Sequence, residues 1–237
     1  METKQILDFL RQLRENNSLA WMKAHKDEYE TVKRTFEDLV GELVTRLVPI
    51  DEELAALQDV SPRDLMFRLN RDTRFSADKT PYMPSFRVHM ARGGKAIIPL
   101  GYYLNVEPDN IFVGAGMHSA SIPGTVQMIR NAIAERGEEF LKVIENKKFA
   151  AIYPIQGEKL KNVPREYDAG VPAAEYLKFK SLFIQGFISE ADFLDREKFF
   201  KKAGELVKLA KPFTRFLNEA LAEFRFPDKC VFRRGKR

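Results

Sequence analysis

The sequence has few of the side chains that build disulfides or metal clusters. It contains one cysteine, Cys230, and three histidines, His25, His89 and His118. A single cysteine cannot form an internal disulfide, which is typical of a protein from a reducing cytoplasm. The histidines are scattered without ligand spacing, which excludes the usual zinc sites. We therefore expect a cytoplasmic protein with no metal and no cofactor.

Long apolar runs and familiar catalytic motifs are also missing. No run approaches the ~18 apolar residues of a membrane span, and the first residues lack the apolar segment of a signal peptide. There is no Walker loop, no paired histidines of a zinc protease and no Gly-x-Ser-x-Gly elbow. We expect no membrane contact, and the sequence leaves open whether the protein is an enzyme.

The composition is that of an ordinary globular protein. Of the 237 residues, 44% are hydrophobic and 31% are charged, with a formal net charge of +5. A chain of this length can bury roughly 70–75% of its unfolded surface, so one core can form without disulfides or metal. The mild positive charge permits nucleic acid or acidic partners without requiring them. These features do not determine the oligomeric state.

The stretch from residue 68 to residue 82 is dense in charge and lies between apolar segments. It holds four cations and two carboxylates: Arg68, Arg71, Arg74 and Lys79 against Asp72 and Asp78. Pairing within the stretch is therefore incomplete. Arginine is suited to bidentate capture of a carboxylate or phosphate. The leftover positive charge indicates an anion site, and a purely structural network of ion pairs is the alternative.

The spacing of apolar residues predicts extended chain from Met66 to Phe75. In a strand, alternate residues share a face, which would place four polar side chains on one side: Arg68, Asn70, Asp72 and Arg74. We expect the charged residues to gather near one cleft, together with Tyr82 and a residue of the turn at 114–118. Asp72 belongs to that expected cluster.

Two sets of candidate site residues follow. The predicted ligand-binding residues are Arg68, Arg71, Arg74, Lys79, Tyr82 and Tyr103. The candidates for acid–base chemistry are Asp72, Asp78, Tyr82 and His118. His118 is singled out because it follows a predicted strand end, whereas His89 lies within a predicted strand and is interpreted as structural.

The charged stretch also carries a resemblance. It reads Arg-x-x-Arg-Asp-x-Arg-Phe followed by Asp-Lys-x-x-Tyr. Further pieces accompany it along the chain: Asn16-Asn17, Trp21, Tyr102-Tyr103-Leu104, Gly114-Ala115-Gly116 and Leu160-Lys161-x-x-Pro164-Arg165. Together they resemble the conserved hypothetical family called domain of unknown function 2461, over nearly the whole chain. The resemblance implies a single-domain soluble protein of the family's usual size and assigns no activity.

Periodicity predicts an α+β fold, with a mostly antiparallel central sheet and N- and C-terminal helices packed on it. We expect one domain over residues 1–237, comprising a helical part (1–50), a sheet core (66–116), helices (120–148), a loop-rich part with a short strand (149–190), C-terminal helices (191–226) and a basic tail (227–237). Strands are expected over 86–90, 96–106, 111–113 and 182–188. Pro212 is expected to separate two C-terminal helices. Residues expected to be largely buried are Trp21, Phe36, Leu43, Leu104, Ile129 and Phe216.

Two smaller features are the glycine-rich segment 114–116 and the basic tail 227–237. Gly114-Ala115-Gly116 echoes a dinucleotide-binding loop, but Ser119 replaces the third glycine and the preceding strand belongs to a hairpin, so that function is excluded. The basic tail, which includes Val231 and Phe232, is expected to be dispensable for stability.

Two functions remain at this stage. The first is a binding protein or enzyme for a small anionic ligand, such as a phosphate ester or carboxylate, held by the Arg/Lys cluster. The alternative is a non-enzymatic module that binds nucleic acid or protein, in which the Arg/Asp motif is structural. Nucleic acid is the more weakly supported partner, because a charged tail is usually just solvated.

Overall fold

The computed structural model describes residues 2–118 and 122–226. Its helices are α1 (Glu2–Glu15), α2 (Leu19–Ala24), α3 (Lys26–Leu47), the 3-10 helix η1 (Glu52–Leu57), α4 (Pro62–Leu65), α5 (Thr125–Glu135), α6 (Gly137–Ile144), α7 (Lys147–Ile152), α8 (Ala174–Leu177), α9 (Glu190–Leu194) and α10 (Arg196–Ala220). Its strands are β1 (Phe86–Met90), β2 (Tyr102–Val106), β3 (Ile111–Met117) and β4 (Leu182–Ile188). The basic tail lies outside the described residues, so its dispensability stays a prediction.

The four strands form one antiparallel sheet in the order β1-β2-β3-β4. A short turn, 107–110, joins β2 to β3 and favours antiparallel neighbours, whereas the longer segment 91–101 joins β1 to β2. β4 returns after the helices α5 to α8 and pairs with β3 from Ile111↔Ile188 to Met117↔Leu182. The sheet class and the position of Gly114 in a hairpin strand are as predicted from the sequence.

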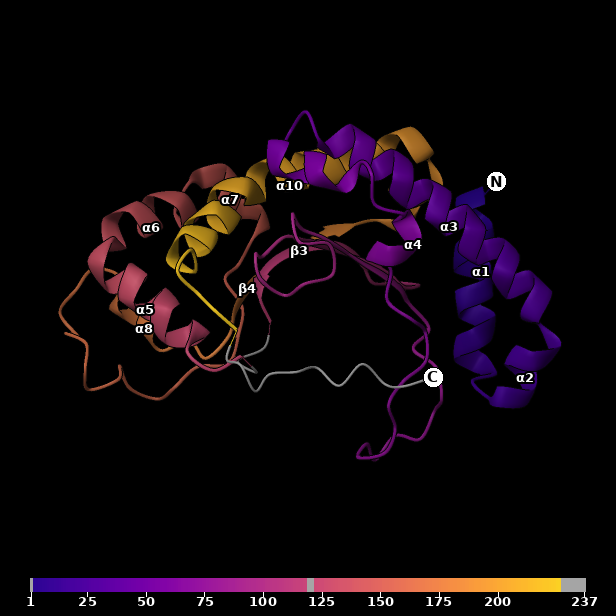
Figure 1. Ribbon diagram of the computed structural model, residues 1–237, viewed down its shortest axis with the longest axis horizontal. Helices are drawn as coiled ribbons and strands as arrows, with labels where there is room; N and C mark the ends of the chain where they lie inside the picture. The colour runs from indigo at the N-terminus through magenta and orange to yellow at the C-terminus, as the bar shows by residue number, and fades with distance from the viewer. Residues whose placement is uncertain (1, 119–121, 227–237) are drawn as a thin grey trace.

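Helices cover one face of this sheet. Alternate residues of every strand are buried on that side, where α10 packs on β3 and β4 and α3 packs on β1. Figure 1 shows α3 and α10 above the sheet, with α1 and α2 at one end of the molecule and α5, α6 and α8 at the other. The arrangement is an arch whose underside is the second face of the sheet. Within the described residues, no helix is long and apolar enough to cross a membrane.

The residues between α4 and β1 form a separate arm, defined here as 66–85. It begins beside β1, where Phe67 N–H donates to the carbonyl of Arg87 at 2.8 Å. Figure 1 shows the arm extending below the sheet. Within the described part of the chain, its strand-like pairings are the isolated bridges Met66↔Val88 and Asn70↔Tyr82. The prediction of a strand from Met66 to Phe75 is therefore wrong.

The arm forms no regular strand because its own side chains accept hydrogen bonds from its backbone N–H groups. Asp72 accepts a hydrogen bond from the N–H of Arg74, and Asp78 accepts one from the N–H of Thr80. Such local bonds compete with a strand ladder. Pro81 has no N–H to donate to a ladder. Local polar chemistry thus outweighs the alternating apolar pattern.

Two other expectations are wrong. The predicted strand from Ala96 is shorter, because β2 begins only at Tyr102. Pro212 lies inside a continuous helix, α10, where it costs ~3 kcal/mol. Burial of Phe213, Phe216 and Leu217 on the same helix outweighs that cost, since each fully buried side chain contributes ~1.5–3 kcal/mol.

Burial otherwise follows the sequence pattern closely. Phe36, Leu43, Leu104, Ile129 and Phe216 are all buried, as predicted. Trp21 is only half-buried, because α2 is a single short helix at the end of the molecule. Its ring stacks on His25 at 4.1 Å between ring centroids and contacts the buried Phe9 at 5.7 Å.

Candidate functional site

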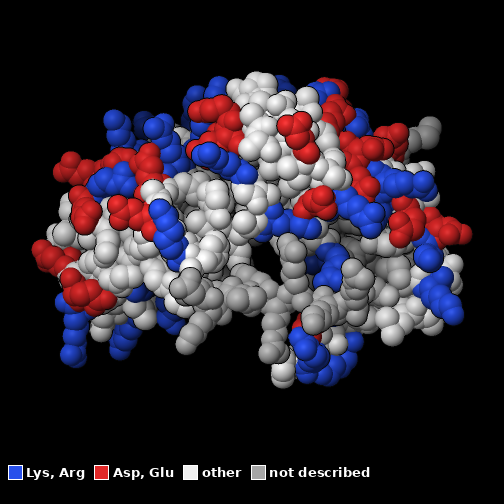
Figure 2. Space-filling view, viewed as in Figure 1, with Lys and Arg blue, Asp and Glu red and all other residues white. Residues whose placement is uncertain are grey.

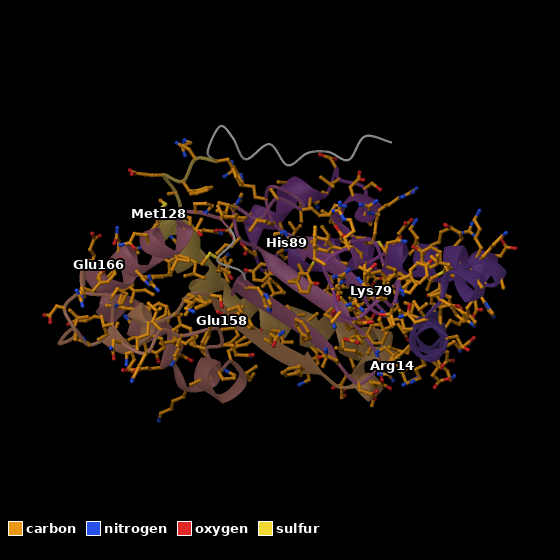
Figure 3. All side chains as sticks on the ribbon, turned by 90° about the horizontal axis from the view of Figure 1, so that it is seen from below. Arg14, Lys79, His89, Met128, Glu158 and Glu166 are labelled. Carbon is orange, nitrogen blue, oxygen red and sulfur yellow. The ribbon has the colours of Figure 1, made fainter. Side chains whose placement is uncertain are left out.

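The face of the sheet turned away from α10 carries polar and aromatic side chains. We call it the open face and define it by two rows of residues that lie side by side across all four strands. The first row is Arg87, Asn105, Phe112 and Phe187. The second row is His89, Tyr103, Gly114 and Gln185. Figure 3, seen from below, shows the strands in front of the helical layer and labels His89 on this side.

Arg87 is a half-buried cation without a carboxylate partner among the described residues. Its Nη2 donates to the carbonyl of Arg68 at 3.0 Å, and its guanidinium lies 5.8 Å from the ring centre of Phe67. Its Nε is buried and has no hydrogen-bond partner in the described part of the chain. Buried charges in proteins are normally paired, so this guanidinium is available to an anion.

His89 and Tyr103 are neighbours in the second row, and burial shifts the pKa of both. Burial lowers the pKa of His89 and is only partly offset by the bond between its Nδ1 and the carbonyl of Gly94, at 3.1 Å. Burial also raises the pKa of the Tyr103 hydroxyl, which the nearby Arg87 opposes. Both side chains are therefore neutral at pH 7. Since a carbonyl only accepts, Nδ1 of His89 carries the proton and Nε2 is an acceptor.

Aromatic rings continue across the open face from the arm to the far edge of the sheet. The ring centres of Phe67 and Tyr103 lie 6.0 Å apart, those of Tyr103 and Phe112 lie 6.1 Å apart, and those of Phe112 and Phe187 lie 6.0 Å apart. Phe187, on the edge strand β4, is 63% exposed. This line of rings offers a flat apolar surface beside Arg87.

Two of the arm's arginines form ion pairs with carboxylates of the arm itself. Arg71 forms an ion pair with Asp78 and donates to the Thr80 hydroxyl at 2.5 Å. Asp72 takes two bonds from Arg74, at 2.9 Å from Nε and 2.6 Å from Nη2. The carboxylates are exposed, and these guanidinium bonds are the main cause that holds the pKa of Asp72 and of Asp78 at about 2. The pairs shape the arm and leave little charge for a ligand at these two arginines.

The remaining predicted residues are distributed along the arm and its base. Arg68 is exposed and has no carboxylate partner within the described residues, while Lys79 donates to the carbonyl of Thr73 at 2.9 Å. Basic side chains are seen on the lower edge of the molecule, where the arm lies (Figure 2). Tyr82 is buried at the arm's base, where the Asn17 amide bonds its backbone N–H at 3.1 Å and its carbonyl at 2.9 Å.

The predicted gathering of charges into one cleft is thus only partly present. The carbonyl of Arg68 accepts a hydrogen bond from Arg87. Tyr103 lies on the same face of the sheet as Arg87. Arg74 and Lys79 lie farther out on the arm, and Asp72 faces Arg74. His118 is exposed at the end of β3, with its ring 4.5 Å from that of Phe183 on β4.

A separate cleft of about 400 Å³ lies on the other side of β1 and β2, beside α10. The buried Tyr102 hydroxyl donates there to Asp51 at 2.6 Å, and Lys211 lies 3.5 Å from the same carboxylate. Asn218 bonds both the N–H and the carbonyl of Leu100, at 2.7 and 2.9 Å. Tyr102, Asp51 and Lys211 therefore satisfy one another in this cleft.

Sequence reasoning missed Arg87 and Gln185 and gave His89 only a structural role. The alternation Phe86-Arg87-Val88-His89-Met90 indicated that Arg87 and His89 share the polar face of a strand. It could not indicate that α3 and α10 lie on the other face of the sheet. No group of three or more His, Cys, Asp or Glu side chains suited to a metal occurs in the part of the chain that the structure describes.

Comparison with known proteins gives a family and no activity. The family profile described as Conserved hypothetical protein (DUF2461) matches residues 5–216, most of the 237-residue chain. Searches of curated proteins and of solved structures found no match. The match covers the arm, all four strands and nearly all of α10, so the open face lies wholly within it. On this basis the chain belongs to the conserved hypothetical protein family DUF2461.

Proposed function

We propose that the protein binds a small molecule with a phosphate or carboxylate group, and that Arg87 is the main anchor of that group. The observation that carries the proposal is a half-buried guanidinium with no carboxylate partner and an unpaired Nε among the described residues. A buried polar group without a hydrogen bond costs ~1–3 kcal/mol. An anion bound at the Nη groups would supply the missing charge.

Arg68 and Tyr103 complete the proposed anchor. The carbonyl of Arg68 accepts a hydrogen bond from Nη2 of Arg87, and Tyr103 lies beside Arg87, which opposes the rise in the pKa of its hydroxyl. In this proposal the Tyr103 hydroxyl lies beside the ligand, and the exposed guanidinium of Arg68 adds positive charge to the same part of the surface. Arg71 and Arg74 serve the arm in this proposal, because their charges are already balanced by Asp78 and Asp72.

Thermal melts in the presence of anions test the proposal. Phosphate, sulfate and a panel of phosphate esters and carboxylates are added to the wild-type protein, with sodium chloride at equal ionic strength as the control. We expect at least one of them to raise the melting temperature in a concentration-dependent way, because a ligand that binds only the folded state stabilises it by mass action. No rise with any anion would contradict the proposal.

A second candidate function is contact with nucleic acid or protein through the arm, in which the Arg/Asp pairs are structural. Phe75 favours it, since this ring is 97% exposed on the arm and lies 5.9 Å from the guanidinium of Arg74. Exposed rings beside cations can stack on unpaired bases. Fluorescence anisotropy with a labelled single-stranded oligonucleotide, comparing wild type with Phe75→Ser, checks it. Equal binding by the two proteins would count against this function.

A further inference from the structure

A pocket of about 250 Å³ lies where the arm meets the N-terminal helices. The Asn17 amide bonds both backbone groups of Tyr82, so the base of the arm is fixed beside the start of α2 (Figure 1). The apolar lining comes from Leu19 and Met22 of α2 and from Leu69 of the arm. We call this space the arm pocket. Its lining shares no described residue with the two rows of the open face.

Tyr82 is buried in the arm pocket, but its hydroxyl has no hydrogen-bond partner among the described residues. Only 8% of the residue is exposed, and it lines the pocket. Backbone hydrogen bonds of 2.9 and 2.7 Å flank the bridge Asn70↔Tyr82, so the two residues form a non-hydrogen-bonded pair. Side chains of such a pair lie close together on one face. Because buried polar groups are normally hydrogen-bonded, the free hydroxyl indicates that a ligand group belongs beside it.

Tyr29 of α3 is a second phenol in the arm pocket. Its ring stacks on the buried Phe9, with 5.9 Å between the ring centres. Its hydroxyl also has no hydrogen-bond partner in the part of the chain that the structure describes. Burial is the main cause that raises the pKa of Tyr29, and the nearby Glu30 and Tyr82 add to the rise. The phenol of Tyr29 is therefore neutral at pH 7 and can donate to an oxyanion.

Two lysines supply positive charge to the arm pocket. Lys23 of α2 and Lys26 of α3 line it, are exposed, and form no ion pair with a described residue. A phosphate monoester carries a charge of about −1.5 to −2 at pH 7, which two ammonium groups balance. Lysine is a common phosphate ligand and acts as a point charge. A carboxylate would leave one of the two lysines unbalanced, so the charges favour phosphate.

The remaining groups limit the rest of the ligand. Glu30 lines the pocket, and its carboxylate lies 3.9 Å from Lys33, so it can accept from hydroxyl groups but repels a second anion. The Asn70 amide can both donate and accept. The volume of about 250 Å³ equals that of ~8 water molecules and is below the ~300–1,000 Å³ of pockets for drug-sized ligands. A short carbon chain with hydroxyl groups meets these limits.

We infer that the arm pocket binds the phosphate monoester of a small polyol of ~3–4 carbon atoms. Its phosphate lies at Lys23 and Lys26 and accepts a hydrogen bond from the hydroxyl of Tyr82, while its own hydroxyl groups face Glu30 and Asn70. This site is separate from the anion site proposed at Arg87 and does not depend on it.

Isothermal titration calorimetry tests the inference with defined probes. Glycerol 3-phosphate and erythritol 4-phosphate are the expected ligands, and inorganic phosphate, glycerol and glucose 6-phosphate are the comparisons. We expect at least one of the two polyol phosphates to bind tenfold or more tightly than inorganic phosphate, because only the esters reach the polar groups at both ends. Glycerol lacks the charge and glucose 6-phosphate exceeds the volume, so both should bind more weakly than the polyol phosphates.

Variants of the pocket locate the ligand. Tyr82→Phe removes only the unpartnered hydroxyl, so it should lower the affinity for the polyol phosphate at least tenfold without lowering the melting temperature. The double variant Lys23→Met/Lys26→Met should abolish binding. Lys201→Met is the matched control, because Lys201 is an exposed lysine of α10 that forms no ion pair with a described residue. It should leave the affinity unchanged.

The outcomes separate this inference from the proposed function. Arg87→Met should keep the binding of the polyol phosphate. Loss of binding in Arg87→Met, with full binding in Tyr82→Phe and in the lysine double variant, would overturn the arm pocket and support Arg87. Equal affinity for inorganic phosphate and both polyol phosphates would also overturn the inference. The experiments on Arg87 accordingly use anions whose effect the lysine double variant leaves unchanged.

Discussion

Replacing Arg87 by methionine separates a ligand-binding arginine from a structural one. Methionine keeps an unbranched side chain that can still pack against Phe67. The change removes a charge-assisted bond to the carbonyl of Arg68, worth ~1.5–3 kcal/mol, and a cation–π contact worth ~0.5–1 kcal/mol. It also removes a buried unpaired N–H, which costs the wild type ~1–3 kcal/mol. These terms largely cancel, so the free energy of unfolding should change by less than ~2 kcal/mol.

The effect of an anion should differ sharply between the two proteins. A ligand at 100 times its dissociation constant stabilises the wild type by ~2.7 kcal/mol. In a domain of this size 1 kcal/mol corresponds to ~2–4 °C, so the melting temperature should rise by roughly 5–11 °C. The Arg87→Met protein should show no rise at the same concentration. Differential scanning calorimetry with and without the anion measures both quantities.

Arg74→Met is the matched control, because it makes the same chemical change at an exposed, internally paired arginine. Arg74 bonds only the neighbouring Asp72, so its loss should leave the anion-dependent rise intact and barely move the melting temperature. The reasoning is refuted if Arg87→Met retains the full rise. It is also refuted if Arg87→Met alone loses ~3–5 kcal/mol and no anion stabilises the wild type, since that loss is typical of a broken buried ion pair.

Three further predictions concern hydrogen bonds and ion pairs that stabilise the arm and the sheet. Asn17→Ala removes both amide bonds to the backbone of Tyr82 and should lower the free energy of unfolding by ~1–3 kcal/mol, measured by urea denaturation. Hydrogen bonding to Arg71 is the main cause that keeps the pKa of Asp78 at about 2, below its unfolded value, so this ion pair stabilises the arm above pH ~4 and is lost as the pH falls through 2. An NMR titration of the carboxyl carbon checks this, and a midpoint near 4 would contradict it. Tyr102→Phe leaves a buried carboxylate without its 2.6 Å donor and should cost ~1–3 kcal/mol in the same urea assay; an unchanged midpoint would show that the bond contributes nothing.

Local features of the fold could be predicted from the sequence because their causes are local. Ser18 caps α2 by accepting from the N–H of Trp21, three residues away. Periodic apolar residues such as Phe36 and Leu43 defined the buried side of α3. The short turn at 107–110 favours antiparallel pairing of β2 with β3. The family pattern in the charged stretch likewise depends only on residue order.

The candidate site depended on contacts that residue order does not contain. The alternation around Arg87 indicated a polar face, but the position of α3 and α10 on the other side of the sheet left it open. The same alternation was misleading in the arm, where hydrogen bonds from Asp72 and Asp78 to nearby N–H groups replaced strand pairing. Propensity is a weak prior when local polar bonds compete with it.

The sequence by itself determined the helices, the antiparallel sheet, most of the core and the family. Tertiary structure alone decided that Arg87 has no carboxylate partner among the described residues, and that Gly114 lies in line with His89, Tyr103 and Gln185. The physical reason is that periodicity reports which side of one element is apolar. Pairing of charges and alignment of rows are set instead by strand register, which joins residues as distant in the chain as Gly114 and Gln185.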